Sequence, residues 1–218
     1  TGVVTLVLCL ATLAVAAYLR GSPPGTLDQL LGGLDLLIVA SSVCLIGLPA
    51  LRLARSRGFV AADTAPIRSY LRIAILGAVL SVPAILIDVL GGFPADINIP
   101  LPEALVAYPA VAFVAELLFH VIPLGVLALL CARRTGSRCA LVALAALPEP
   151  LLQVVWGATH SPLWANALVG LQLLVFNAVG LVVLRRHGLL AAYALRVGYY
   201  GIWHVLWGQW RLGLLFGN

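Results

Sequence analysis

The feature that most constrains this chain is a succession of apolar stretches, each about as long as a bilayer is thick. A transmembrane helix needs about 20 predominantly apolar residues. Of the 218 residues, 62% are hydrophobic and only 10% are charged. A soluble domain carries roughly 25% charged residues, and this chain has too few to cover such a core. We therefore predict an all-α, polytopic integral membrane protein, a single transmembrane domain over residues 1–218 that contacts the lipid bilayer.

The apolar stretches predict a bundle of about seven transmembrane helices, within a range of six to eight. The expected spans are Gly2–Leu19, Leu30–Leu51, Tyr70–Leu90, Glu103–Cys131, Cys139–Gly157, Trp164–Leu184 and Leu189–Phe216. Proline breaks a helix ladder, so Pro83 should kink the third span, and Pro148 with Pro150 should interrupt the fifth. Whether the seventh span is broken near Gly208 is left open by the sequence.

The arginines predict the orientation of the chain in the membrane. All 13 basic side chains are arginines, and ten of them lie in or beside the second, fourth and sixth connections. The positive-inside rule places these connections in the cytoplasm, and hence the N-terminus too. We expect a bacterial inner membrane as the location. The net charge of +5 then reflects topology, and nucleic acid is not an expected partner.

Ionisable groups at mid-membrane depth cost several kcal/mol, so each needs a reason. Glu116 and His120 are four residues apart and share a helix face. Such a pair can supply two ligands to a metal, or it can be a plain buried hydrogen bond. Glu149 and His160 would share a face if the helix continues past Pro150. Alternatively, Glu149 begins a helix that restarts at the prolines, and His160 is solvated at the end of the span.

Three polar side chains repeat every four residues along the seventh span: Arg196, Tyr200 and His204. A buried arginine almost demands an anionic neighbour. We predict that the Arg196 guanidinium turns inward and pairs with a carboxylate, Glu116 first and Glu149 second. Asn177 is the expected hydrogen-bond donor between helices.

Other polar and aromatic residues near the span ends have simpler expected roles. Asp88 lies near the end of the third span, where hydration would account for it. Tyr199, Trp203, Trp207 and Trp210 are expected to form an interfacial aromatic belt.

Short motifs in the second half of the chain resemble those of the CPBP family, the intramembrane CAAX-protease and bacteriocin-processing proteins. That family reads E-E-x-x-x-R on one helix, F-x-x-x-H on the next and H-x-x-x-N (or D) on a late helix. Here Ala115–His120 resembles the first motif, and Trp156–His160 resembles the second. Phe176–Gly180 and the stretch from Arg185 through His204 resemble the last two spans. The resemblance covers residues 103–208 and implies a CPBP-like core there.

The departures from the family pattern fall on its chemistry. Ala115 stands at the first glutamate, which in the family activates a water, and His120 stands at the arginine of that motif. Arg196 stands at the histidine of the third motif, and Tyr200 at its Asn or Asp. Only His160 keeps the expected residue type among the four catalytic positions.

Two functions follow from this resemblance. We favour a non-catalytic CPBP-fold protein, an accessory or scaffolding subunit of a membrane assembly with other membrane-protein subunits as partners. In it, Arg196, Tyr200, Glu149 and Asn177 would belong to a buried network. The alternative is a divergent, metal-dependent intramembrane protease or hydrolase. Its catalytic set would be Glu116, His160 and His204, and a zinc ion could be held by His120, His160 and His204; no other cofactor is expected.

Overall fold

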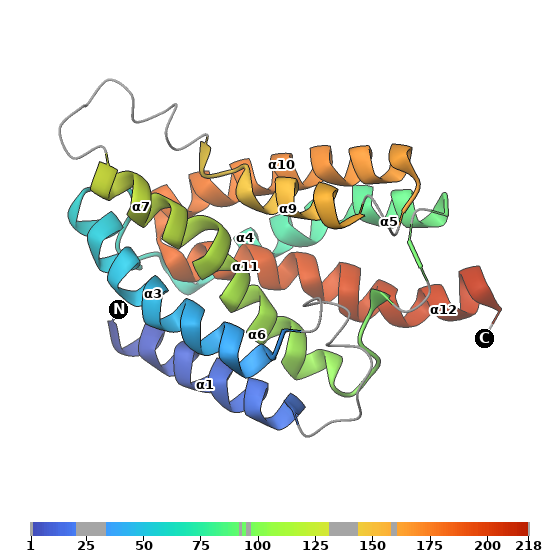
Figure 1. Cartoon of the computed structure of the whole chain (residues 1–218), viewed down its shortest axis with the longest axis horizontal. Helices are drawn as coiled ribbons and strands as arrows, with labels where there is room; N and C mark the ends of the chain where they lie inside the picture. Colours follow the sequence, from blue (N-terminus) through green and yellow to red (C-terminus); the bar gives the residue numbers. More distant parts are fainter. Residues whose placement is uncertain are drawn as a thin grey trace.

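A computed structural model describes residues 2–20, 34–91, 93–94, 97–130, 144–157 and 161–217 of the chain. The helices in chain order are α1 (Gly2–Arg20), α3 (Leu36–Ser56), α4 (Ile67–Leu80), α5 (Val82–Val89), α6 (Ala104–Glu116), the π-helix η2 (Leu117–Val121), α7 (Ile122–Leu130), α9 (Pro148–Gly157), α10 (Leu163–His187), α11 (Leu189–Tyr200), the π-helix η3 (Gly201–Trp207) and α12 (Gly208–Phe216). These ranges contain no strand. The chain is an all-α membrane helix bundle (Figure 1), as its composition predicted.

Among the described residues, five helical segments are long and apolar enough to cross a bilayer. They are Gly2–Arg20, Leu36–Ser56, Ile67–Val89, Ala104–Leu130 and Leu163–His187. They correspond to the first four expected spans and to the sixth. The second begins later than expected because Asp35 caps α3, its Oδ1 accepting from the N–H groups of Leu37 (2.8 Å) and Ile38 (3.2 Å).

The remaining two expected spans differ from the others. In the fifth, the described helix is α9, whose ten residues rise about 15 Å, roughly half of a hydrocarbon core. It begins at Pro148, because proline is well accommodated in the first turn of a helix. In the seventh, the chain stays helical from Leu189 to Phe216. The break near Gly208, which the sequence left open, is absent, and a π-helical segment precedes that residue.

The third span is interrupted where a proline predicted a kink. α4 ends at Leu80, and α5 begins at Val82 with Pro83 in its first turn. Two backbone carbonyls at this break accept hydrogen bonds from side chains. The Ser81 hydroxyl donates to the Ala78 carbonyl at 2.7 Å, and Gln172 Nε2 on α10 donates to the Leu80 carbonyl at 3.1 Å.

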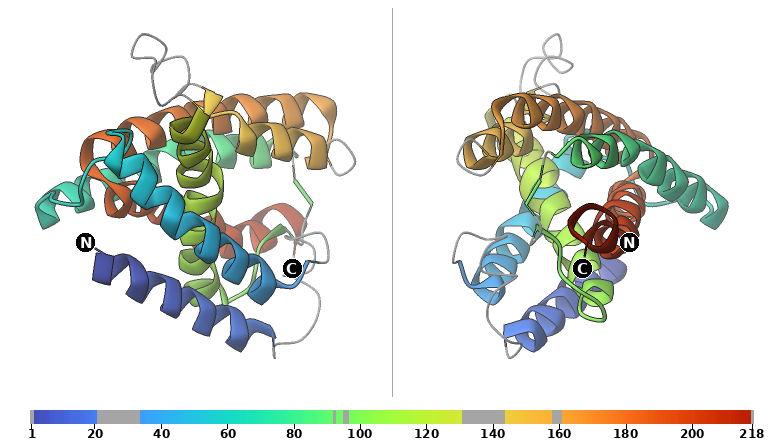
Figure 2. Two further views of the ribbon diagram at one scale, coloured as in Figure 1. Left: turned by 60° about the vertical axis from the view of Figure 1, so that its left-hand side comes forward. Right: turned by 90° about the vertical axis from the view of Figure 1, so that its right-hand side faces the viewer.

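Helix α11 lies at the centre of the bundle and contacts α4, α6 and α10, as the views in Figures 1 and 2 show. α4 and α11 approach each other closely because each presents a glycine at their crossing. A Cβ built on Gly77 would overlap the carbonyl of Leu195, and one built on Gly198 would overlap that of Ala74. Small residues let transmembrane helices approach in this way.

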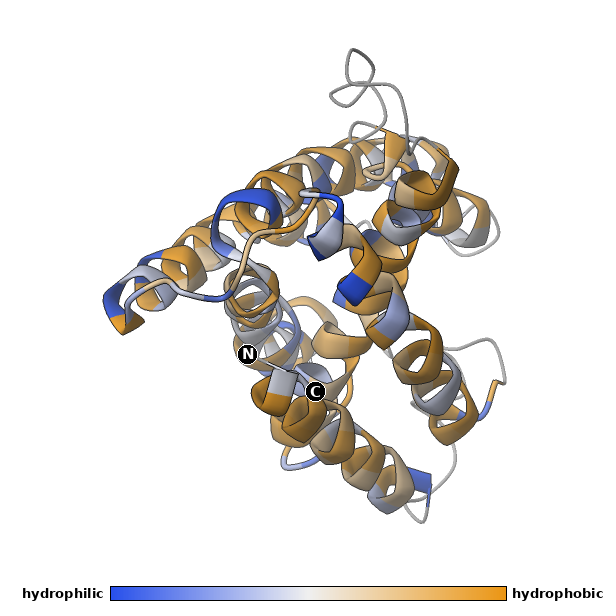
Figure 3. Cartoon of the chain, turned by 90° about the vertical axis from the view of Figure 1, so that its left-hand side faces the viewer, coloured by the Kyte–Doolittle hydropathy of each residue, from blue (hydrophilic) through white to orange (hydrophobic). Residues whose placement is uncertain are grey.

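The outward faces of the bundle are apolar. Large hydrophobic side chains such as Leu45, Ile67, Leu130, Val155 and Leu163 are more than 70% exposed. Figure 3 accordingly shows hydrophobic colour over most of the helical surface. In water such a surface would aggregate, whereas in lipid it is the expected exterior.

The second and sixth connections meet at one end of the molecule. Ala61 N–H donates to the Leu184 carbonyl at 3.4 Å, and Leu190 N–H donates to Asp63 Oδ1 at 2.8 Å. We call this end the arginine-rich end, defined by Arg52, Arg55, Arg57, Arg68, Arg72, Arg185 and Arg186. Helix α1 also begins on this side, and α12 ends on the other (Figure 1). The arginines of the fourth connection, Arg133, Arg134 and Arg138, lie outside the described residues.

Candidate functional site

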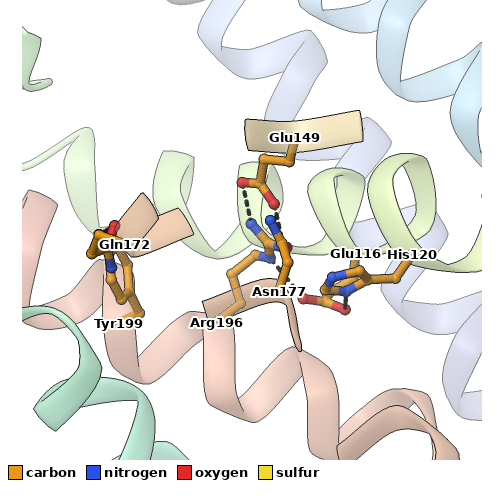
Figure 4. A network of polar contacts seen from close by, with 7 residues as sticks. All are labelled: Glu116, His120, Glu149, Gln172, Asn177, Arg196 and Tyr199. Atoms are coloured by element: carbon orange, nitrogen blue, oxygen red, sulfur yellow. Dashed lines mark hydrogen bonds and ion pairs between the residues drawn. The ribbon is translucent and has the colours of Figure 1, made fainter. Parts of the chain in front are cut away.

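The most polar place in the bundle interior is built around Arg196 of α11. Figure 4 shows its guanidinium between Glu149 of α9 on one side and Glu116 of α6 on the other. The side chain of Arg196 is 0% exposed. A charge in this position is stable only if anionic partners surround it, and the structure supplies two of them.

The first pair, between Arg196 and Glu149, is bidentate. Nη1 lies 2.6 Å from Oε1, and Nη2 lies 2.8 Å from Oε2. Two parallel N–H···O bonds make the strongest arginine–carboxylate geometry. Glu149 sits in the first turn of α9, where the positive end of the helix dipole also favours a carboxylate.

The second pair, between Arg196 and Glu116, is extended by His120. Arg196 Nε donates to Glu116 Oε1 at 2.7 Å, and His120 Nδ1 lies 2.7 Å from Glu116 Oε2. Because an ionised carboxylate can only accept, Nδ1 carries the hydrogen. Glu116 and His120 are both fully buried. The sequence ranked Glu116 ahead of Glu149 as the partner; the structure joins both acids to the same guanidinium.

Asn177 and Tyr200 complete the surroundings of Arg196. Asn177 Oδ1 accepts from Arg196 Nη2 at 3.3 Å, so the amide acts as an acceptor here and not as the expected donor. The guanidinium carbon lies 6.0 Å from the centre of the Tyr200 ring and 5.1 Å from that of Phe176. These aromatic faces provide cation–π contacts in place of water.

Two buried nitrogen atoms near this network, His120 Nε2 and Asn177 Nδ2, have no hydrogen-bond partner among the residues that the structure describes. The His120 ring reaches its position because Gly180 of α10 has no side chain. A Cβ there would lie 2.9 Å from His120 Cε1. The imidazole thus occupies the space that any other residue at position 180 would fill.

His204 is held separately from Glu116 and His120. Its Nδ1 lies 2.7 Å from Asn98 Oδ1, and its ring stacks on Tyr108 with the centroids 4.4 Å apart. Asn98 Oδ1 also accepts from the Tyr108 hydroxyl at 3.4 Å. His204 therefore ties η3 to the segment before α6. His160, the remaining histidine of the expected catalytic set, lies outside the described residues.

A cavity of about 150 Å³ nevertheless connects His204 with part of the network. Glu149, Arg196, Tyr200 and His204 all contribute to its lining. Glu149 is the acid that faces it, since its side chain is 12% exposed whereas Glu116 is fully enclosed.

The described residues do not by themselves make a metal site. Nowhere within the described ranges do three His, Cys, Asp or Glu side chains come together as a ligand set. Structural and catalytic zinc sites need at least three protein ligands. Of the ligands proposed for zinc in the hydrolase alternative, His120 bonds to Glu116 and His204 bonds to Asn98, and His160 lies outside the described residues.

Sequence reasoning missed another buried ion pair, which lies at the end opposite the arginine-rich end. Arg211 of α12 holds Asp88 of α5 in a bidentate pair, with Nε–Oδ2 at 2.6 Å and Nη2–Oδ1 at 2.7 Å. Asp88 is 1% exposed, so the expected hydration of this residue is wrong. No local sequence signal identifies this pair, because its two members lie 123 residues apart in the chain.

The expected aromatic belt is wrong for three of its four members. Tyr199 and Trp203 are each 4% exposed, and Trp207 Nε1 donates to Asp88 Oδ2 at 2.7 Å. Trp210 alone among the four is largely exposed, at 60%. Trp203 packs against Phe93, with the ring centroids 5.2 Å apart, and Tyr199 packs against Phe176 at 4.7 Å. These side chains therefore belong to the bundle interior.

A third ion pair, also missed, fixes the arginine-rich end. Asp63 is paired with Arg55 and accepts the Leu190 N–H at 2.8 Å. Its carboxylate approaches Gly188, which has a φ of 89°. A side chain at position 188 would collide with Asp63.

Comparison with models of known protein families, with curated proteins and with solved structures finds no match to this chain. The function must therefore be argued from the geometry of the molecule itself.

Proposed function

We propose that this chain is a non-catalytic membrane protein of the CPBP fold that serves as an accessory or scaffolding subunit of a membrane assembly. In this proposal, the place of the family's catalytic centre is taken by the ion-pair network of Glu116, Glu149 and Arg196.

The observation that carries the proposal is the state of the two carboxylates. All four of their oxygens accept hydrogen bonds, three from Arg196 and one from His120. A general base must also lie within hydrogen-bond reach of the water whose proton it takes. Glu116, at the glutamate position that the motif keeps, is also fully buried.

The residue that occupies the third-motif histidine position supports the same conclusion. An arginine remains protonated at neutral pH and cannot ligate a metal. In the middle of a bundle its fixed charge instead binds helices together, here α6, α9 and α11. Such a network stabilises a scaffold, whereas in a hydrolase it would occupy the carboxylate that has to act as the base.

One observation favours the alternative, a divergent metal-dependent hydrolase. His120 lies in η2 and His204 lies in η3, and these two segments are the π-helices of the described chain. π-helical segments occur frequently at functional sites. His120 Nε2 also has no hydrogen-bond partner within the described part of the chain, which leaves it available to coordinate a metal.

We further propose that the N-terminus is cytoplasmic and that the protein resides in a bacterial inner membrane. Support comes from the meeting of the second and sixth connections at one end, which gathers seven arginines there. A positive cluster of this kind is typical of the cytoplasmic side.

Purification from native membranes in a mild detergent tests the function. We expect well below one metal ion per chain by elemental analysis, together with one membrane-protein partner at fixed stoichiometry. The partner should still co-purify with the variants His120→Gln and His204→Gln, because neither histidine is catalytic in this proposal. About one zinc per chain that is lost in His120→Gln would establish the hydrolase instead.

A further inference from the structure

One feature of the outer surface, remote from the ion-pair network, has the shape of a ligand site. A groove of about 450 Å³ lies between α4 and α10 on the outer face of the bundle. Ile73 and Leu76 of α4 line one wall, and Val179 and Val182 of α10 line the other. Arg186 and His187 close the groove at the arginine-rich end. It is therefore apolar along its length and basic at one end.

The length of the groove matches one leaflet of a bilayer. It follows α10 from Ala178 to His187, and nine residues of helix rise about 14 Å. The hydrocarbon core is about 30 Å thick, so this is about half of it. Because α10 ends at His187, the groove runs from the headgroup level to the middle of the membrane.

The charge at the mouth of the groove has no acidic partner in the described ranges of the chain. Arg186 is exposed in the last turn of α10, and Arg72 of α4 is exposed one turn before Leu76 on the same face. The structure records no ion pair for either among the residues it describes. Asp63, the acid at this end, is already paired with Arg55 and has a fully buried side chain.

We propose that this groove binds an anionic phospholipid of the leaflet at the arginine-rich end. One acyl chain lies along the valines and leucines, and the phosphate accepts hydrogen bonds from Arg186, His187 and Arg72. Guanidinium groups bind phosphate oxygens in a two-pronged geometry. Basic pockets between transmembrane helices are recurrent sites for anionic headgroups.

Native mass spectrometry of the purified protein, titrated separately with phosphatidylglycerol, phosphatidylethanolamine and phosphatidylcholine of identical chains, tests the proposal. We expect one phosphatidylglycerol per chain to bind more tightly than either zwitterionic lipid. Arg186→Gln and Arg72→Gln should each weaken that binding about fivefold, the effect expected for one charge at the membrane surface.

Two further variants separate the groove from a general attraction of anions to this end. Arg52→Gln with Arg57→Gln removes two charges, one more than either test variant, from exposed positions that do not line the groove. Phosphatidylglycerol binding should nevertheless change little. Ala178→Phe fills the inner end of the groove without altering charge, and it should weaken binding at least as much as one arginine change.

Three results would overturn the proposal. Equal affinity for all three lipids would show that the groove does not select an anionic headgroup. An equal loss in the Arg52→Gln and Arg57→Gln control would reduce the effect to surface charge. Binding that is unchanged in Ala178→Phe would show that the acyl chain does not occupy the groove.

Discussion

Arg196 and Glu149 join α11 to α9 through two parallel hydrogen bonds of 2.6 and 2.8 Å. Helix α9 otherwise packs mainly against α10, so this pair is its principal link to the centre of the bundle. Glu116 binds the same guanidinium but also keeps His120 as a partner. The two acids therefore depend on Arg196 to different degrees.

Replacement of Arg196 by leucine should destabilise the protein strongly. Removing one member of a buried ion pair typically costs about 3–5 kcal/mol, because the other charge is stranded. Glu149 would lose both of its hydrogen bonds, whereas Glu116 would retain that of His120. We therefore expect the second change Glu149→Gln to recover more stability than Glu116→Gln, measured as the free energy of unfolding in mixed detergent micelles.

The control for this experiment is Arg196→Leu combined with Glu103→Gln. Glu103 precedes α6 and Glu116 ends it, a separation of about 20 Å of helix rise, so its change should rescue nothing. Equal rescue by all three acid changes would mean that net charge, and not the pairing, sets the stability.

Most of the long apolar helices were predictable from the sequence, because hydrophobic length is a local property of the chain. The inward turn of Arg196 was predictable for the same reason, since an arginine at that depth has few alternatives. The Asp88–Arg211 pair was not, because it joins positions 123 residues apart that each lie near a span end. Near an end, hydration explains a charge as well as pairing does.

The placement of the histidines shows a second limit of sequence reasoning. Spacing by four put Arg196, Tyr200 and His204 on one face of a regular α-helix. The structure keeps all three beside one cavity, but His204 bonds to Asn98 while Arg196 bonds to Glu116. The partner of His204 was not predictable from spacing, because Asn98 lies 106 residues away in the chain.

The Asp88–Arg211 pair yields a prediction of its own. Arg211 is fully buried and also donates to the carbonyls of Pro94 (2.9 Å) and Phe93 (3.2 Å). Arg211→Leu should lower the free energy of unfolding by about 3–5 kcal/mol, since it strands the Asp88 carboxylate. Without the guanidinium, the segment before α6 would also lose these two hydrogen bonds. Faster cleavage by a protease near residue 94 would show this.

The pair Arg20–Asp35 offers a matched surface control. It has a similar N–O distance of 2.9 Å, but the Arg20 side chain is 63% exposed. Exposed pairs contribute about 0–1 kcal/mol, so Arg20→Leu should leave the unfolding midpoint almost unchanged. If Arg20→Leu lowered the free energy of unfolding as much as Arg211→Leu, burial would not be what makes the Asp88–Arg211 pair stabilising.

The proposed orientation predicts the labelling of single cysteines introduced into a cysteine-free variant. Ser56 and His187 are exposed at the arginine-rich end, and Leu101 is exposed in the connection before α6. A membrane-impermeant maleimide added to intact cells should label Leu101→Cys but neither Ser56→Cys nor His187→Cys. Permeabilised cells should show labelling at all three. The reverse pattern in intact cells would place the arginine-rich end outside.

The crossing of α4 and α11 predicts that two neighbouring glycines differ sharply in their tolerance of a methyl group. A Cβ on Gly198 would overlap the backbone of Ala74, whereas one on Gly201 meets no atom within 4 Å. Gly198→Ala should force the helices apart, and overpacking of this kind costs about 1–3 kcal/mol. Gly201→Ala should be neutral or slightly stabilising, because alanine restricts the unfolded chain. Unfolding midpoints of the two variants in the same detergent check this, and equal losses would show that α4 and α11 are not in backbone contact in the membrane.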